Sequence, residues 1–114
     1  MTLEIACHTQ DFGTVGQIEV SDLADIASAG YKSIINNRPD GEGGSSQPLS
    51  AEIAAAAKEQ GLAYAYLPVI SGQMTHEQVE EMTKLLQTLP KPVLAFCRSG
   101  ARSTQLYMFT QRLV

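Results

Sequence analysis

The sequence predicts an α/β fold in which a mostly parallel central sheet carries helices on both faces. Short apolar runs alternate along the 114-residue chain with segments of helical periodicity. The connections between these runs are of helical length, and right-handed crossovers of this kind join parallel strands of one sheet. The run at 93–96 is apolar throughout, as expected of a strand that is buried on both faces.

Residue types at the ends of each segment justify the individual elements. Ser21 is expected to cap the first helix, which Gly30 ends, and Ser50 to cap the second. Thr75 and Gln78 have the spacing of a capping box for the third helix. The predicted elements are strand-like pieces at 3–7 and 12–18, strands at 31–35, 62–69 and 93–96, and helices at 21–29, 51–60, 75–89 and 101–113.

Composition and charge limit the classes of function. The chain is expected to form one domain, 1–114, with a single hydrophobic core. No apolar run approaches the ~18 residues that a membrane span needs. No signal peptide is expected either, because the first residues include an acid and no basic region. A net charge of −4 argues against nucleic acid as a partner. Two cysteines make no disulfide framework, so the cytoplasm is the expected compartment.

Cys97 is the principal candidate for a reactive group. It follows the apolar run 93–96 and precedes a loop of small residues, so its thiol would lie at the N-terminus of the last helix. Arg98 and Arg102 flank it. Both features favour thiolate over thiol, which indicates a nucleophilic cysteine. The alternative is a buried structural cysteine, but two arginines with Gly100 between them favour the catalytic interpretation.

Three loops are expected to meet at the carboxyl edge of the sheet, where sites of open α/β folds lie. Arg38, Asp40 and Glu42 would therefore lie near Cys97. The alternative for this segment is a surface turn with an ion pair. The loops in question are 37–49, 70–74 and 98–101.

The stretch from Phe96 to Ser103, Phe-Cys-Arg-Ser-Gly-Ala-Arg-Ser, looks like the active-site loop of rhodanese sulfurtransferases. The rest of the chain is similar instead to the phosphatase-like domain of beta-lactamase hydrolase-like proteins, most clearly at Asn-Asn-Arg-Pro-Asp-Gly-Glu, 36–42. That resemblance implies a fold like that of dual-specificity tyrosine phosphatases. It also implies a persulfide dioxygenase or a rhodanese as a fused or neighbouring partner in sulfide detoxification.

Two departures from the tyrosine phosphatase pattern favour sulfur chemistry. Those phosphatases have five residues between the cysteine and the arginine, whereas only four separate Cys97 from Arg102. The loop 70–74, where such enzymes usually carry an aspartic acid as general acid, has no carboxylate. Transfer of a sulfur atom needs no proton on the leaving group. We therefore expect a sulfurtransferase that acts through a Cys97 persulfide.

Two alternatives remain open at this point. One is a tyrosine or dual-specificity phosphatase-like hydrolase that acts through a Cys97 phosphocysteine. The other is a non-catalytic module that binds anions or senses thiols. The expected partners are a small anionic sulfur donor with a thiol acceptor, or else a phosphorylated substrate.

The residues expected at the site fall into two groups. The first group is catalytic and comprises Cys97, Arg102 and Asp40. The second group would bind the substrate and comprises Arg98, Ser99, Gly100, Ala101, Ser103 and Arg38.

No cofactor and no metal are expected. His8 and His76 form no ligand cluster with either cysteine. Cys7 is expected to fill space near the first strand, and the alternative is a resolving thiol for Cys97.

Overall fold

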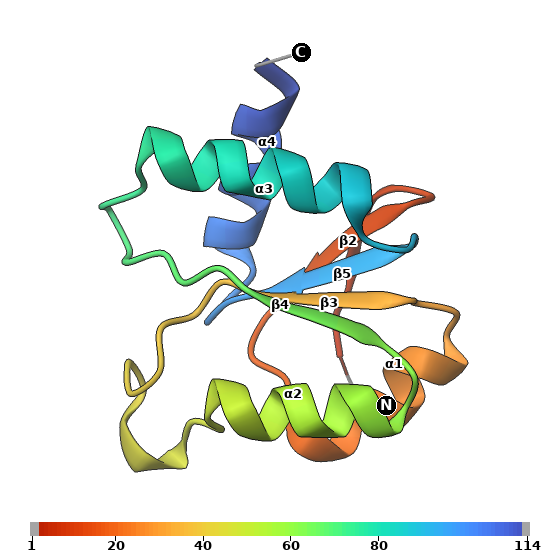
Figure 1. The fold of residues 1–114 in the computed structure, drawn as a ribbon. Coiled ribbons are helices and arrows are strands. Elements are labelled where there is room, and N and C mark those ends of the chain that lie inside the picture. The colour runs from red at the N-terminus through yellow and green to blue at the C-terminus, as the bar shows by residue number, and fades with distance from the viewer. Residues whose placement is uncertain (1–2, 113–114) are drawn as a thin grey trace.

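The computed structural model describes residues 3–112 and contains a five-stranded sheet between two layers of helices (Figure 1). The strand order is β1-β2-β5-β3-β4. β1 runs antiparallel to β2, and every other pair of neighbours is parallel. The predicted fold class, a mostly parallel central sheet with helices on both faces, is therefore confirmed.

The elements have the following bounds. The strands are β1 (Ala6–Thr9), β2 (Phe12–Val15), β3 (Ser33–Asn36), β4 (Ala63–Tyr66) and β5 (Val93–Phe96). The helices are α1 (Leu23–Ser28), α2 (Ser50–Glu59), α3 (His76–Thr88) and α4 (Ala101–Arg112), with short 3-10 turns at Val20–Asp22 and Gly44–Ser46.

The central strand β5 contributes to two cores because successive side chains of a strand point to opposite faces. Leu94 and Phe96 pack with Ile34 on the face covered by α1 and α2. Val93 and Ala95 pack on the face covered by α3 and α4 (Figure 1). All four residues of β5 are buried, which fits the uninterrupted apolar run in the sequence.

The N-terminal strands differ in extent from the prediction. β1 begins and ends later than the predicted piece at 3–7, and β2 ends at Val15 rather than at residue 18. The Thr9 hydroxyl accepts a hydrogen bond from the Asp11 N–H at 3.0 Å and closes a tight turn between the strands. Beyond Val15 the chain leaves the sheet, and the Gln17 N–H donates to the Arg98 carbonyl at 3.2 Å.

Two of the predicted helix caps are wrong. Ser21 lies inside the 3-10 turn that precedes α1, and the Glu19 N–H at the start of that turn donates to Asp22 Oδ2 at 2.8 Å. Ser50 is the first residue of α2 rather than its cap. In both places an acidic side chain supplies the acceptor that a serine hydroxyl was expected to supply.

Other boundaries follow the local chemistry. The capping box at α3 is confirmed, with Gln78 N–H donating to Thr75 Oγ1 at 3.2 Å and Thr75 N–H donating to Gln78 Oε1 at 2.8 Å. β4 is shorter than the predicted strand 62–69. The Leu67 N–H still donates to the Asn36 carbonyl at 2.9 Å, but the Val69 N–H donates to the Asn37 carbonyl at 3.0 Å, so the regular register with β3 ends there. The predicted end of the last helix at Leu113 lies outside the described residues.

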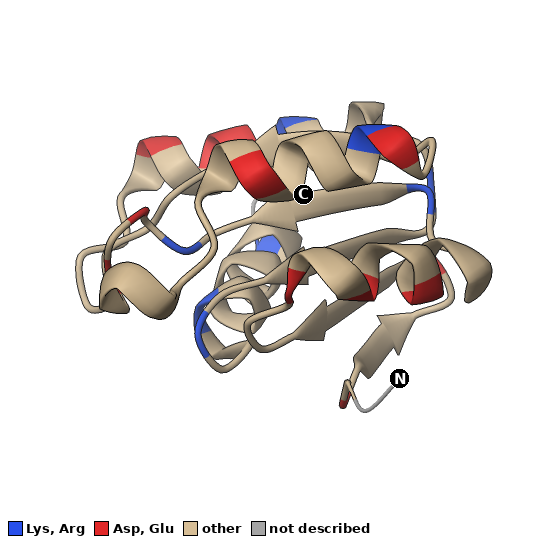
Figure 2. Cartoon of the chain, turned by 90° about the horizontal axis from the view of Figure 1, so that it is seen from below, with Lys and Arg blue, Asp and Glu red and all other residues tan. Residues whose placement is uncertain are grey.

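Charged residues of both signs are dispersed over the molecule. On the face seen in Figure 2, segments with Lys or Arg are separated from one another and interspersed with acidic segments. Within residues 3–112, no helix is both long and apolar enough to cross a membrane.

Candidate active site

The candidate nucleophile lies directly after the central strand. Cys97 follows β5, is fully buried, and is linked through residues 98–100 to the first turn of α4. The N–H of Gly100 donates to the Cys97 Sγ at 3.1 Å. Gly100 has φ +92°, and a Cβ atom there would lie 3.3 Å from the Val15 carbonyl carbon. Glycine therefore permits both the turn of the loop and its close approach to β2.

The loop stabilises the Cys97 thiolate. Burial by itself raises the pKa of Cys97, but polar contacts of its sulfur with the backbone and hydroxyl of Ser103 and with the backbone of Ser99 and Arg102 outweigh burial and lower the pKa. The direction agrees with the prediction of an acidic cysteine. It makes Cys97 more nucleophilic at neutral pH than an ordinary thiol.

Ser103 joins this loop to the neighbouring strand. Its hydroxyl donates to Asn37 Oδ1 at 2.8 Å, and it is also within hydrogen-bonding reach of Cys97. Asn37 directly follows β3, and its own N–H donates to the Phe96 carbonyl at 2.8 Å. Both side chains are fully buried. Asn37 was not predicted as a site residue, although its place after a buried strand was a usable signal.

Arg102 is held by a fork of hydrogen bonds with Glu42. Nη1 donates to Glu42 Oε2 at 2.7 Å and to the Val69 carbonyl at 2.8 Å, while Nη2 donates to Glu42 Oε1 at 2.6 Å. These bonds use both hydrogens of Nη1 and leave Nε–H and one hydrogen of Nη2. The Cys97 sulfur lies close enough to the Arg102 guanidinium to help hold its positive charge and raise its pKa, after the larger effect of Glu42. The two hydrogens that remain, on Nε and Nη2, lie along one edge of the guanidinium.

Glu42 lies between two guanidinium groups. Arg38 Nε donates to Glu42 Oε1 at 3.0 Å, and Arg38 Nη1 donates to Gln17 Oε1 at 3.0 Å. The hydrogen bond from Arg102 is the largest influence on the Glu42 carboxyl and lowers its pKa, and Arg38 adds to this effect. From the sequence, Arg38 was predicted to bind the substrate, and the alternative for its segment was a turn with a surface ion pair. In the structure Arg38 is buried and pairs with Glu42, and its contact with a substrate stays a prediction.

A hollow of about 740 Å³ opens beside this cluster. Arg98 and Ser99 line it and are exposed, in keeping with their predicted contact with a substrate. Ile70 and Ser71 also line it, and the loop that holds them carries no carboxylate. Among the described residues that line the hollow, Glu42 is the one that carries a carboxylate. The full set is Arg38, Glu42, Gly43, Ile70, Ser71, Arg98, Ser99, Ala101 and Arg102.

Asp40 has a different place from the other predicted catalytic residues. Its Oδ1 accepts a hydrogen bond from the Ser50 N–H at 2.7 Å, at the N-terminus of α2. Its own N–H donates to the Tyr66 hydroxyl at 2.9 Å. Like the fully buried Cys97, Asp40 is not among the residues that line the hollow beside Arg102, but unlike Cys97 it is exposed. Its predicted catalytic role stays a prediction, while its contacts are those of a helix cap.

Cys7 lies apart from this cluster. It is exposed on the edge strand β1, whereas Cys97 is buried, and both thiols are free. Burial and the neighbouring Cys7 raise the pKa of Tyr31. Residues 3–112 contain no group of three or more His, Cys, Asp or Glu side chains arranged to hold a metal ion.

The fold and the site define an α/β protein of the tyrosine phosphatase-like class, with its Cys–Arg loop after the central strand. Over residues 4–114 the chain matches the family described as "Beta-lactamase hydrolase-like protein, phosphatase-like domain", and it belongs to that family. The resemblance to this phosphatase-like domain, stated from the sequence, is thereby confirmed.

Relatives of known name are considerably longer than this chain. Beta-lactamase hydrolase-like proteins of Xylella fastidiosa (strain Temecula1) and Agrobacterium fabrum are 38% and 33% identical over 84% and 86% of the chain. In each case the match covers 22% of the relative. The chain thus spans about a fifth of the length of these relatives.

Solved structures agree on the fold. A putative phosphatase from Neisseria meningitidis superposes with a TM-score of 0.83 at 33% identity, covering 90% of this chain and 72% of that one. The active form of the phosphatase Tk-PTP superposes with a TM-score of 0.71 at 16% identity over 88% of this chain and 65% of that one. The second likeness concerns the fold alone.

Proposed function

We propose that the chain is a cysteine-dependent phosphatase of the tyrosine phosphatase type. The observation that carries the proposal is the Arg102 guanidinium, which Glu42 holds in place beside a thiolate embedded in N–H donors. A planar guanidinium edge matches two oxygens of a phosphoryl group. The likeness to the N. meningitidis protein over most of the chain supports the same reaction class.

The proposed reaction proceeds in two displacements at phosphorus. The Cys97 thiolate attacks phosphorus, the bond from phosphorus to the ester oxygen breaks, and its electron pair leaves with that oxygen. Arg102 and the N–H groups of the loop neutralise charge on the phosphoryl oxygens during this step. Water then attacks the phosphocysteine, releasing phosphate and restoring the thiolate.

Protonation of the leaving group restricts the range of substrates. Glu42 is held ionised between Arg102 and Arg38, and its lowered pKa makes it a poor proton donor. General-acid help is typically worth ~10²–10⁴ in rate. We therefore expect aryl phosphates with acidic phenols to react faster than phosphotyrosine, and alkyl phosphates to react slowest.

A phosphate-release assay tests the proposal. Wild-type protein should hydrolyse p-nitrophenyl phosphate, Cys97→Ser should have no measurable turnover, and Arg102→Lys should lose most of the activity because lysine cannot bind two oxygens with one planar edge. Circular dichroism of each variant serves as the folding control. Equal turnover by wild type and Cys97→Ser would show that Cys97 is not the nucleophile.

Sulfur transfer is the second candidate, and the length of the loop favours it. Only four residues separate Cys97 from Arg102, and the thiol is fully buried, so the cradle suits one sulfur atom better than a tetrahedral phosphoryl group. Cys97 would take the outer sulfur of thiosulfate, releasing sulfite. An acceptor thiolate would then take that sulfur and restore the Cys97 thiolate. A persulfide dioxygenase or rhodanese remains a proposed partner for this reaction.

One preparation assayed in parallel decides between the two reactions. Phosphate release from p-nitrophenyl phosphate reports the first, and sulfite release from thiosulfate with glutathione as acceptor reports the second. Faster phosphate release that depends on Cys97 supports the phosphatase. Faster sulfite release that depends on Cys97 supports the sulfurtransferase, and no turnover in either assay favours a binding or sensing module.

A further inference from the structure

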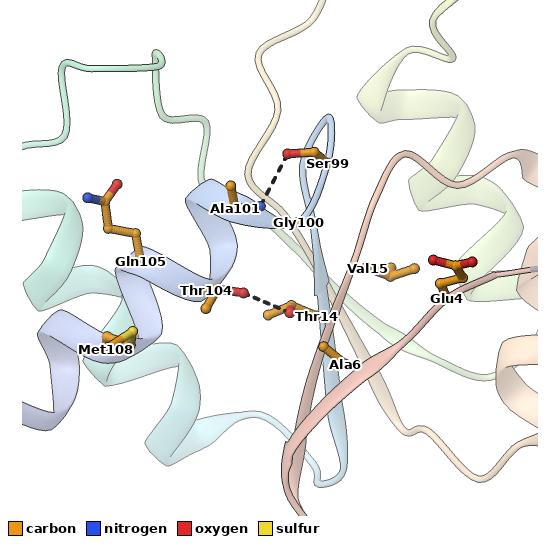
Figure 3. Close-up of a pocket in the computed structure, with 10 residues that line it drawn as sticks. All are labelled: Glu4, Ala6, Thr14, Val15, Ser99, Gly100, Ala101, Thr104, Gln105 and Met108. Carbon is orange, nitrogen blue, oxygen red and sulfur yellow. Dashed lines mark hydrogen bonds between the residues drawn. The ribbon is translucent and has the colours of Figure 1, made fainter.

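A second hollow, of about 600 Å³, lies on the other side of the active-site loop (Figure 3). It is bounded by β1, β2 and α4, and it shares Ser99 and Ala101 with the hollow beside Arg102. A substrate held at the loop can therefore extend into it without crossing the protein. Nothing in the proposed chemistry uses this space.

The lining of this second hollow combines apolar walls with one charged end. Ala6, Val15 and Met108 supply apolar surface, and Met108 is 56% exposed. Figure 3 shows Glu4 and Met108 on opposite sides of the view, with the Thr14–Thr104 hydrogen bond of 2.9 Å between them. Glu4 is the charged residue of the lining, and it forms no ion pair with any residue in 3–112.

The two hollows have opposite charge. Arg38, Arg98 and Arg102 against Glu42 leave a positive excess in the first, while Glu4 makes the second negative. An anion is therefore attracted to one side of the loop and repelled from the other. A long basic side chain suits the second hollow, since its stem can cover apolar surface while its cationic end meets a carboxylate.

We propose that this second hollow binds a lysine or arginine side chain of a phosphorylated peptide, close in sequence to the phosphorylated residue. The inference rests on the proposed phosphatase function and names its substrate class. The phosphoryl group would lie at Cys97 and Arg102, the peptide would pass over Ser99 and Ala101, and the basic side chain would end at Glu4. Glu4 thus acts as a specificity-determining residue and takes no part in the chemistry.

Binding can be measured without turnover in a Cys97→Ser background. The probes are fluorescent phosphotyrosine peptides in which one flanking residue is lysine, norleucine or glutamate, placed in turn at each neighbouring position on either side. At one or more positions the lysine peptide should bind about two- to five-fold more tightly than the norleucine peptide, as expected of an exposed ion pair. Glu4→Gln should remove that preference, and Glu4→Lys should shift it to the glutamate peptide.

Matched controls separate this inference from the proposed function. Glu59→Gln removes one exposed negative charge from the end of α2 and should leave the lysine preference intact. In proteins that retain Cys97, wild type and Glu4→Gln should hydrolyse p-nitrophenyl phosphate equally well, because this substrate is too small to reach Glu4. Failure of that hydrolysis in the wild type would overturn the phosphatase alone. An equal lysine preference with and without the Glu4→Gln substitution, or no binding of any phosphopeptide, would overturn the second binding site.

Discussion

At the scale of single residues, Glu42 sets the geometry of the site. Its two oxygens engage Arg102 and one of them also accepts from Arg38, so the carboxylate fixes the plane of the guanidinium that faces Cys97. Phosphate and carboxylate compete for guanidinium in general. Here the carboxylate uses the Nη1/Nη2 end of Arg102 and leaves its Nε edge for a substrate.

Replacing Glu42 by Gln should lower kcat/KM for p-nitrophenyl phosphate about ten- to a hundred-fold, because one charge-assisted hydrogen bond is worth about 1.5–3 kcal/mol. Steady-state kinetics measure this, with Glu59→Gln as the control for a lost negative charge. An unchanged kcat/KM would mean that Val69 and the loop position Arg102 without help from Glu42.

The pKa of Cys97 should be lower than that of an ordinary cysteine. The donors around its sulfur lower the pKa despite burial, and the reference value is about 8.5. The rate of alkylation by iodoacetamide, followed against pH, should reach half of its maximum below that reference. Cys7→Ser must be present in the background, because Cys7 is exposed and would also react. A midpoint at or above the reference would contradict the stabilised thiolate.

At the scale of elements, the turn from β5 into α4 depends on Gly100. Its φ of +92° is unfavourable for a residue with a side chain, and a Cβ there also meets the backbone of Val15. Gly61 has φ +74° at the end of α2, but a Cβ there would meet nothing within 4 Å. The two positions therefore separate backbone strain from steric conflict.

Gly100→Ala should lower the free energy of unfolding by about 2–4 kcal/mol, the sum of strain and contact, and Gly61→Ala by about 1–2 kcal/mol from strain alone. Urea unfolding measures both. Gly100→Ala should also abolish turnover, because its N–H is displaced from the Cys97 sulfur. Equal destabilisation by the two substitutions would show that β2 moves away from the loop at little cost.

Substitutions of Asp40 can distinguish a role as general acid from a role as the cap of α2. Asparagine caps helices about as well as aspartate but cannot donate a proton as an acid. If Asp40 only caps α2, Asp40→Asn should keep both stability and activity, while Asp40→Ala should lose about 1 kcal/mol of stability. Thermal unfolding and phosphate release give the two readouts. A loss of activity in the stable Asp40→Asn protein would identify Asp40 as the general acid.

The elements were largely predictable, and the reasons are local. The strand at 93–96 and the capping box of Thr75 and Gln78 can be predicted from neighbouring residues alone. The caps predicted at Ser21 and Ser50 were wrong because an acidic residue supplies the acceptor instead. Asp22 accepts from the Glu19 N–H in the first case, and Asp40 accepts from the Ser50 N–H in the second. Such competition between two suitable side chains is settled by tertiary structure.

At the scale of the whole molecule, parallel topology brings together residues that are distant in sequence. Strand order placed Cys97 and Arg38 at one edge of the sheet, as expected from the sequence alone. The contact between Glu42 and Arg102, which are sixty positions apart in the sequence, could not be predicted from strand order. That contact depends on the path of the loop 37–49. The same loop carried both Asp40 and Glu42, and only the structure distinguishes their partners.

The Glu42 cluster should make the stability of the whole chain depend on pH. Its carboxyl has a lowered pKa in the folded protein, whereas in the unfolded chain the value is about 4.3. Its contribution is therefore fully present above about pH 4.3 and is lost as pH falls through the lower folded pKa. Above that range wild type should be more stable than Glu42→Gln, and the difference should shrink as the solution is acidified.

Urea unfolding of wild type and Glu42→Gln at a series of pH values between neutral and about 3 measures this difference. Glu59→Gln, measured alongside, accounts for the loss of one negative charge at a site remote from the arginines. High salt should reduce the wild-type advantage, because the Glu42 side chain is 26% exposed and its ion pairs are partly screened. A difference that stays constant across the series would show that the two guanidiniums do not hold Glu42 in its ionised form.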